Sequence, residues 1–290
     1  MRLRTAIFGV LLFLQSALVL TGGAVRLTGS GLGCPTWPEC TPGSYTPVPH
    51  QAEGQLHAWI EFGNRLLTFA LLLSALAAVI YVLKSGRKDL RSLAAGQVLG
   101  IVGQGVLGGI TVLTDLHPLP VAGHLLLSMF LIAGATSLYS RRHAPQVKVP
   151  APTKTVSVIS QLHLAVAFIV LILGTLVTGS GPHAGDEKAQ RFGFDIRTVA
   201  ILHADAVIFL VGITIALLVA ASVAQSTKRA IYIFFVITLA QGAIGYTQYL
   251  TGIPEALVAA HLAGATIFWI AAWRIRLSVV RTSQQEREQL

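Results

Sequence analysis

Three histidines of this 290-residue chain lie inside long apolar stretches, each shortly after the stretch begins: His124, His203 and His261. An ionisable side chain inside a membrane span is costly, so it marks a functional site by default. Two imidazoles at matching depth on neighbouring helices can bind a haem iron from both sides, and His203 and His261 fit that pattern. The alternative for each histidine is a core residue hydrogen-bonded to a carbonyl group; three depth-matched histidines favour iron ligation.

The N-terminal part of the chain offers a different set of ligands. Asn64 stands at the position that matches His203 when the same spacing is applied. Asparagine is a poor iron ligand, so a haem here would be bound by His124 alone, or with His57, which shares a helix face with Asn64. A five-coordinate haem suits a substrate better than an electron carrier. We therefore predict an exchangeable haem in this part, with Asn64 and His57 as candidate contacts.

Glu61 is another costly residue in an apolar stretch, one helical turn from both His57 and Arg65. Its carboxylate could accept a proton or stabilise developing positive charge, which makes it the candidate catalytic residue. The alternative is a salt bridge with Arg65 at the i,i+4 spacing. Such a pair keeps the carboxylate ionised and does not exclude chemistry.

The composition requires a membrane around these residues. Hydrophobic residues make up 53% of the chain and charged residues 11%, with a mean hydropathy of +0.69. A soluble domain carries about 25% charged residues, so an ordinary soluble enzyme is excluded, as are disordered and collagen-like chains. A helix needs about 20 apolar residues to cross a bilayer. We predict an all-α polytopic membrane protein with eight spans at roughly 5–22, 58–83, 93–113, 120–140, 156–177, 199–222, 230–251 and 256–277.

Basic residues indicate how the spans are oriented. Of the 21 lysines and arginines, 16 lie near the two ends or after spans two, four and six: Arg2, Arg4, Lys84, Arg87, Lys88, Arg91, Arg141, Arg142, Lys148, Lys154, Lys228, Arg229, Arg274, Arg276, Arg281 and Arg287. The opposite loops hold only Arg26, Lys188, Arg191 and Arg197. The positive-inside rule then places both termini in the cytoplasm. We predict a multi-pass protein of the cell membrane. This charge is a topology signal, and no nucleic-acid partner is expected.

The outer side predicted in this way includes both cysteines, Cys34 and Cys40, in the loop GSGLGCPTWPECTPG. Two thiols do not complete a zinc site, and disulfides persist outside the cytoplasm. A structural disulfide is favoured, and a redox-active pair is the alternative. Arg26, Arg191 and Arg197 on the same side could bind haem propionates.

An internal repeat divides the chain into halves, 1–147 and 148–290. Residues 104–124 and 241–261 are identical at eight of 21 aligned positions, including Gln104/Gln241 and the final histidines, and Thr-Gly-Ser-Gly occurs at both 28–31 and 178–181. Each half has four spans, so the two halves form a parallel repeat of four-helix bundles. The first apolar run resembles a signal peptide, but we expect it to remain a span because the repeat needs it and no cleavage site is well placed.

Several motifs together resemble the haem A synthase family over essentially the whole chain. They are the eight spans in two halves, GGAVRLTGSGLGCPTWPEC after the first span, IEFGNRLL near the start of the second, and one histidine near the start of the fourth, sixth and eighth spans. The resemblance implies oxidation of haem O to haem A, a cofactor of terminal cytochrome oxidases. In that reaction the C8 methyl group becomes a formyl group whose oxygen comes from water.

The resemblance also implies roles for individual residues. His203 and His261 would be the axial ligands of a haem b cofactor, and His124 would bind the iron of the substrate, haem O. Glu61 matches an acidic residue that assists methyl oxidation by stabilising positive charge, and Asn64 departs from the family, many members of which have histidine there. The implied partners are haem O synthase, an electron acceptor that the sequence does not identify, and the lipid bilayer; a homo-oligomer is compatible with the sequence.

Two other functions are considered. A diheme membrane cytochrome that only transfers electrons predicts two equivalent bis-histidine sites, and Asn64 breaks that equivalence. A transporter predicts a charged path through the middle of the membrane, where few charges are found.

Overall fold

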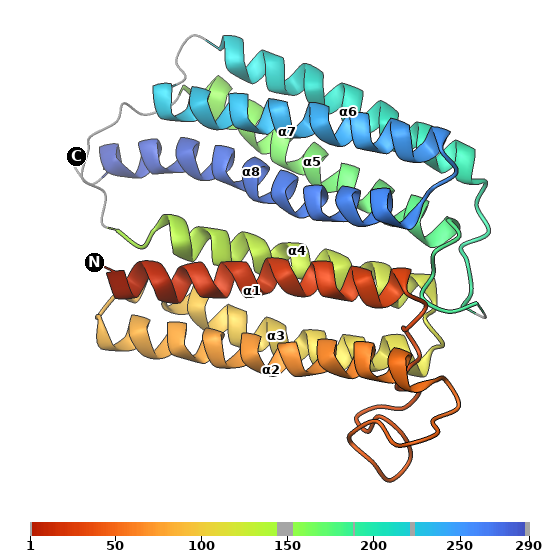
Figure 1. Ribbon diagram of the computed structural model, residues 1–290. Coiled ribbons are helices and arrows are strands. Elements are labelled where there is room, and N and C mark those ends of the chain that lie inside the picture. Colours follow the sequence, from red (N-terminus) through yellow and green to blue (C-terminus); the bar gives the residue numbers. More distant parts are fainter. Residues whose placement is uncertain (1, 144–152, 188, 221–223, 288–290) are drawn as a thin grey trace. The chain divides into compact units, whose positions relative to one another are not determined.

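Eight long helices form the described part of the chain, residues 2–143, 153–187, 189–220 and 224–287 of a computed structural model (Figure 1). They are α1 (Arg2–Leu27), α2 (Gln55–Lys84), α3 (Arg91–Leu113), α4 (Pro118–Ser140), α5 (Lys154–Ser180), α6 (Ile196–Val219), α7 (Gln225–Leu250) and α8 (Glu255–Arg287), with a short 3₁₀ helix, η1 (Lys88–Leu90), before α3. All eight are long and apolar enough to cross a membrane. The predicted all-α class with eight spans is confirmed for these residues.

Most helices extend a few residues beyond the predicted spans because polar residues continue them at their ends. Helix α1 reaches Leu27 rather than residue 22. The chain turns away from the helix at Gly29, whose φ of 67° is one that glycine adopts without strain. The N–H of Ser30 donates to the carbonyl of Val25 at 2.9 Å, and the N–H of Gly29 donates to the carbonyl of Arg26 at 3.3 Å. This is a Schellman motif. It places Arg26 in the last helical turn instead of in the loop.

The chain divides into two compact units. The first holds the described residues up to Tyr139 together with Thr175–Ile196, and the second holds those of Ser140–Gly174 and Arg197–Leu290. Helices α1–α4 run side by side in the first unit, and α6–α8 do so with most of α5 in the second (Figure 1). The predicted boundary at 147/148, like Lys148 and Lys188, lies outside the described residues, and the repeat of four-helix halves stays a prediction.

The interior of the first unit is largely apolar, but it also contains buried polar contacts. Phe8, Leu71 and Leu138 are among the buried side chains that join its helices. Within this core the Nε2 of Gln15 donates to the Oε1 of Gln97 at 3.0 Å. Large apolar side chains also cover the outside of the helices, as expected where lipid replaces water.

Candidate functional site

Two of the predicted iron ligands, His203 of α6 and His261 of α8, lie close together in the second unit. Their ring centroids are 6.4 Å apart, and the ring planes are inclined at 78°. An imidazole nitrogen binds a metal ion at about 2 Å, so two rings that share one metal have centroids about 6 Å apart. The observed separation therefore fits a pair of axial ligands.

The surroundings of both rings are suited to that role. The Nδ1 of His203 lies 3.1 Å from the carbonyl oxygen of Val170. Because a carbonyl only accepts, Nδ1 carries the proton and the lone pair of Nε2 is left for a metal. A Cβ atom added to Gly174 would lie 3.4 Å from the Cε1 of His203, and one added to Gly245 would lie 3.4 Å from the Cε1 of His261. Each ring is thus packed against a glycine of a neighbouring helix.

The third predicted ligand, His124 of α4, is held against α3 in the first unit. A Cβ atom added to Gly108 would lie 3.1 Å from its Nε2, so this histidine is also packed against a glycine. The main-chain carbonyl of His124 accepts hydrogen bonds from the Nε2 of Gln104 at 3.0 Å and from the hydroxyl of Ser128 at 3.0 Å. These two donors fix the helical turn that carries the imidazole.

Asn64 of α2 has its own partner on α1. The hydroxyl of Thr21 donates to the Oδ1 of Asn64 at 2.7 Å, and a Cβ atom added to Gly22 would lie 3.9 Å from the Nδ2 of Asn64. Asn64 therefore faces a glycine of a neighbouring helix, as His203 does, but its side chain is an amide. His124 lies against α3 and Asn64 against α1, so their immediate neighbours differ.

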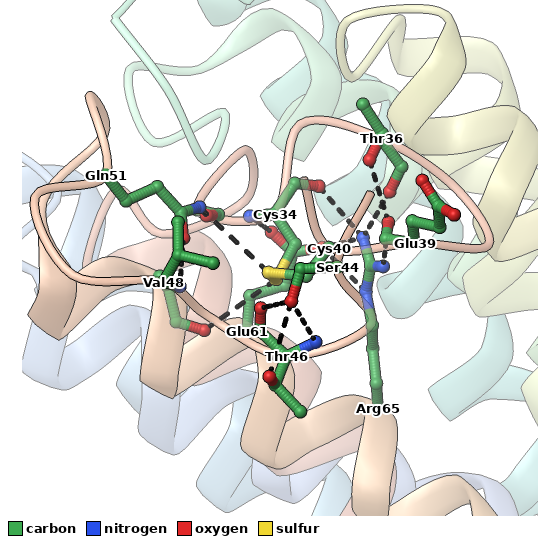
Figure 2. The surroundings of a disulfide bond; sticks show 12 residues. Cys34, Thr36, Glu39, Cys40, Ser44, Thr46, Val48, Gln51, Glu61 and Arg65 are labelled. Atoms are coloured by element: carbon green, nitrogen blue, oxygen red, sulfur yellow. Dashed lines mark hydrogen bonds and ion pairs between the residues drawn. A yellow bond between two sulfur atoms is a disulfide. The ribbon is translucent and has the colours of Figure 1, made fainter. Parts of the chain in front are cut away.

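Glu61 is buried where α2 meets the loop that follows α1, with 6% of its surface exposed. Its Oε1 accepts hydrogen bonds from the Nε and Nη2 of Arg65 at 3.1 and 2.6 Å, and its Oε2 accepts one from the backbone N–H of Cys34 at 2.7 Å (Figure 2). The i,i+4 salt bridge with Arg65, considered above as the alternative role of Glu61, is present. The contact with the loop was not predicted.

The expected disulfide between Cys34 and Cys40 is confirmed, with an S–S distance of 2.02 Å (Figure 2). Both cysteines are completely buried. The Nε2 of Gln51 donates to the carbonyl of Gly33 and lies 4.0 Å from the Sγ of Cys40. The disulfide therefore sits inside the folded loop next to α2 and the proposed catalytic carboxylate.

His57 lies one turn before Glu61 and is bound to the end of α1. Its Nδ1 is 2.8 Å from the Oγ of Ser30, which in turn is 2.8 Å from the Oγ1 of Thr28. A Cβ atom on Gly33 would overlap the backbone of His57 and Ala58, so only glycine lets the loop approach α2 this closely. These contacts make His57 part of the junction between the loop and α2.

The three arginines predicted to lie on the outer side, Arg26, Arg191 and Arg197, differ in their contacts. Arg26 donates through Nε to the carbonyl of His183 and through Nη2 to that of Thr178 at 2.8 Å, and Arg191 donates through Nη2 to that of Pro182 at 2.6 Å. Both bind main-chain carbonyls within the first unit, at the end of α5 and in the loop that follows it. Arg197 is exposed in the second unit.

The fourth histidine inside a span, His163, is fully buried in α5 and packs edge-on against Phe234, with 4.6 Å between ring centroids. It lies away from His203 and His261 along α5, since the carbonyl that binds His203 belongs to Val170, two turns later. Its environment is that of a core residue.

Several functional neighbours were missed from the sequence. Thr21, Ser30 and Gln104 bind the side chains or backbone of predicted site residues. For Thr21 and Gln104 the available signal was a polar residue on an otherwise apolar helix, and for Ser30 it was the repeated Thr-Gly-Ser-Gly segment. The first signal locates a buried hydrogen bond but does not identify its partner.

Within the described ranges, no group of three or more His, Cys, Asp and Glu side chains gathers to hold a metal ion. A protein-built zinc site needs three or four such ligands, whereas a haem brings four equatorial nitrogens and needs at most two more. Two imidazoles are as many protein ligands as a metal held in a macrocycle takes.

Comparisons with known proteins indicate the family of the chain. A haem A synthase of Sinorhizobium fredii is 26% identical over 91% of this chain and 87% of its own length. One of Rhizobium leguminosarum is 26% identical over 92% and 88%, and one of Shewanella oneidensis is 31% identical over 56% and 51%. Residues 5–185 match the model of a family described as cytochrome oxidase assembly protein. That match covers more than half of the chain, which therefore belongs to the cytochrome oxidase assembly protein family, COX15-CtaA, and is a multi-pass membrane protein.

Proposed function

We propose that the protein is a haem A synthase, which oxidises the C8 methyl group of haem O to a formyl group for cytochrome oxidase assembly. The observation that carries the proposal is the close pair of imidazoles, His203 and His261, with ring centroids 6.4 Å apart. Two relatives that align with 91% and 92% of the chain are named haem A synthases. The second unit would hold haem b as its cofactor. When bound, haem b would accept electrons one at a time from the substrate and pass them on.

The residues of the second unit fit a bis-histidine haem. The carbonyl of Val170 fixes the tautomer of His203, and the Nδ1 of His261 is buried without a hydrogen-bond partner among the described residues. Gly174 lies beside the ring of His203 and Gly245 beside that of His261, each on a neighbouring helix. His203 and His261 would bind the iron, and the surrounding helices would exclude water from it.

The first unit would bind the substrate, haem O, with His124 as the iron ligand and Asn64 and His57 as further contacts. The conversion of R–CH₃ and water into R–CHO releases four protons and four electrons, so groups that accept protons or stabilise positive charge are needed. Glu61 is the proposed catalytic residue. Its carboxylate is held by three N–H donors and is thus fixed before the substrate arrives.

The location and partners complete the proposal. The distribution of basic residues supports a plasma-membrane protein with both termini in the cytoplasm and the disulfide loop outside. Haem O synthase would supply the substrate, and an electron acceptor still to be identified would remove the electrons. The lipid bilayer surrounds the helices, and assembly into a homo-oligomer is compatible with the sequence.

The paired imidazoles would also serve a diheme cytochrome that only transfers electrons, so the two functions need a direct test. The purified protein, expressed in a host that makes haem O, is extracted with acidified organic solvent and its haems are separated by chromatography. We expect haem b together with haem O or haem A. Two molecules of haem b per chain and no other haem would favour the cytochrome.

A further inference from the structure

The loop that contains the disulfide is attached to α2 by one arginine. Arg65 donates through Nη2 to the carbonyls of Cys34 at 2.9 Å and Thr36 at 3.1 Å, and through Nη1 to the carbonyl of Glu39 at 3.2 Å (Figure 2). All three carbonyls belong to residues 34–40, the ring of chain that the Cys34–Cys40 disulfide closes. We call these residues the disulfide ring. Arg65 therefore binds three points of one covalently closed segment.

The same ring also binds Glu61 directly. The backbone N–H of Cys34 donates to its Oε2 at 2.7 Å, while Arg65 occupies its Oε1. Both carboxylate oxygens are thus held, one by a peptide group of the disulfide ring and the other by the arginine that the ring itself positions.

A second side of the ring rests on α3. The indole ring of Trp37 lies so close to Gly109 that a Cβ atom there would overlap it. The ring is therefore seated on two helices, α2 through Glu61 and Arg65 and α3 through Trp37. A segment held in this way can transmit a change in its own covalent structure to the groups that it contacts.

We propose that the disulfide ring is a clamp that positions Glu61 and that reduction of the disulfide releases this carboxylate. Cys34 and Arg65 are then positioning residues, and the proposal rests on the proposed function only for its effect on activity. The reductant is a dithiol: the S–S bond breaks, each Sγ gains one hydrogen, and the dithiol loses two electrons and two protons to become a disulfide. The opened segment regains conformational freedom. The N–H of Cys34 and the three carbonyls are then no longer held at fixed positions beside Glu61 and Arg65 of α2.

The closed form is the active one. A fixed carboxylate stabilises developing charge without first having to reorient, whereas a mobile one must be ordered during the reaction. We expect reduction to lower the rate of methyl oxidation about 100-fold, the size of effect that a misplaced catalytic group can have, and reoxidation to restore it.

The decisive measurement is the reactivity of Glu61 in the full-length protein in lipid nanodiscs. A hydrophobic carbodiimide labels the oxidised protein, the protein reduced with dithiothreitol, and the reduced protein after reoxidation, and peptide mass spectrometry quantifies the label on Glu61. We expect labelling to rise several-fold on reduction and to return on reoxidation. Hydrogen exchange of the peptide that contains Cys34 should follow the same course.

Variants separate positioning from general loop stability. Cys34→Ser with Cys40→Ser should resemble the reduced protein permanently. Arg65→Lys keeps the charge but loses the planar fork that binds three carbonyls, so it should raise labelling of Glu61 even with the disulfide intact. Thr46→Val, in the same loop but outside the disulfide ring, is the matched control and should behave as the wild type.

Equal labelling of Glu61 in the oxidised and reduced proteins would overturn the proposal, even if activity fell, because the disulfide would then act on loop stability alone. Labelling needs no haem. A chain that shows the reversible change in labelling but never forms haem A would support the clamp while contradicting the proposed function.

Discussion

The Nε2 of Gln104 on α3 donates a 3.0 Å hydrogen bond to the main-chain carbonyl of His124 on α4. The same nitrogen lies 2.6 Å from the hydroxyl of Ser128, which donates to that carbonyl as well. Gln241, the counterpart of Gln104 in the sequence repeat, lies against Gly264 of α8, three residues after His261. Both glutamines thus contact the helix that carries a candidate iron ligand.

Gln104→Leu removes one of the two donors that hold the turn bearing His124. Changes to groups that orient a metal ligand commonly lower affinity by about 10- to 100-fold, and we expect a loss of this size for haem O. An absorbance titration of the purified protein with haem O measures it. Gln97→Leu, in the same helix, is the control and should leave haem affinity unchanged; equal affinity in wild type and Gln104→Leu would contradict the orienting role.

His203→Ala and His261→Ala each remove one imidazole of the close pair. We expect either change to abolish the low-spin bis-histidine absorption spectrum and to reduce the haem b content of the purified protein. His163→Leu replaces a buried histidine of the same unit that packs against Phe234. This control should retain both the low-spin spectrum and the haem b content. A normal low-spin spectrum in His203→Ala would show that the pair does not bind the iron.

Glu61→Gln keeps the size of the side chain but removes its charge. Removing a group that takes part in proton transfer typically slows a reaction by about 10²- to 10⁴-fold, so haem O should accumulate at the expense of haem A. Chromatography of extracted haems from cells producing the variant gives the ratio. Glu53→Gln, at an exposed glutamate just before α2, should leave the ratio as in the wild type; an unchanged ratio in Glu61→Gln would remove its catalytic role.

Asn64→His supplies the imidazole that the first unit lacks. If haem O is bound by His124 with Asn64 nearby, the added ligand should convert the ferric substrate haem from high spin to low spin, which electron paramagnetic resonance detects. Thr21→Val removes only the hydroxyl that donates to Asn64 and should leave the haem high-spin. A low-spin substrate haem already present in the wild type would contradict a single protein ligand.

Hydropathy was sufficient to predict the eight helices, because a run of about 20 apolar residues has few alternatives to a membrane-spanning helix. The i,i+4 spacing was likewise sufficient for the Glu61–Arg65 pair, since it depends only on the geometry of one helix. The helix ends were predicted less well. The Schellman motif at Gly29, for example, extends α1 through Arg26, a charged residue that hydropathy had excluded.

The sequence by itself determined which residues are costly in a membrane and therefore need partners: His203, His261 and Glu61 among them. Only the tertiary structure decided what those partners are. The carbonyl of Val170 and the backbone N–H of Cys34 are main-chain groups, which every residue carries, so no residue type identifies them in advance. Which main-chain group becomes the partner depends on the rotation of each helix about its axis and on the position of the disulfide ring against α2. Packing of the whole unit determines both.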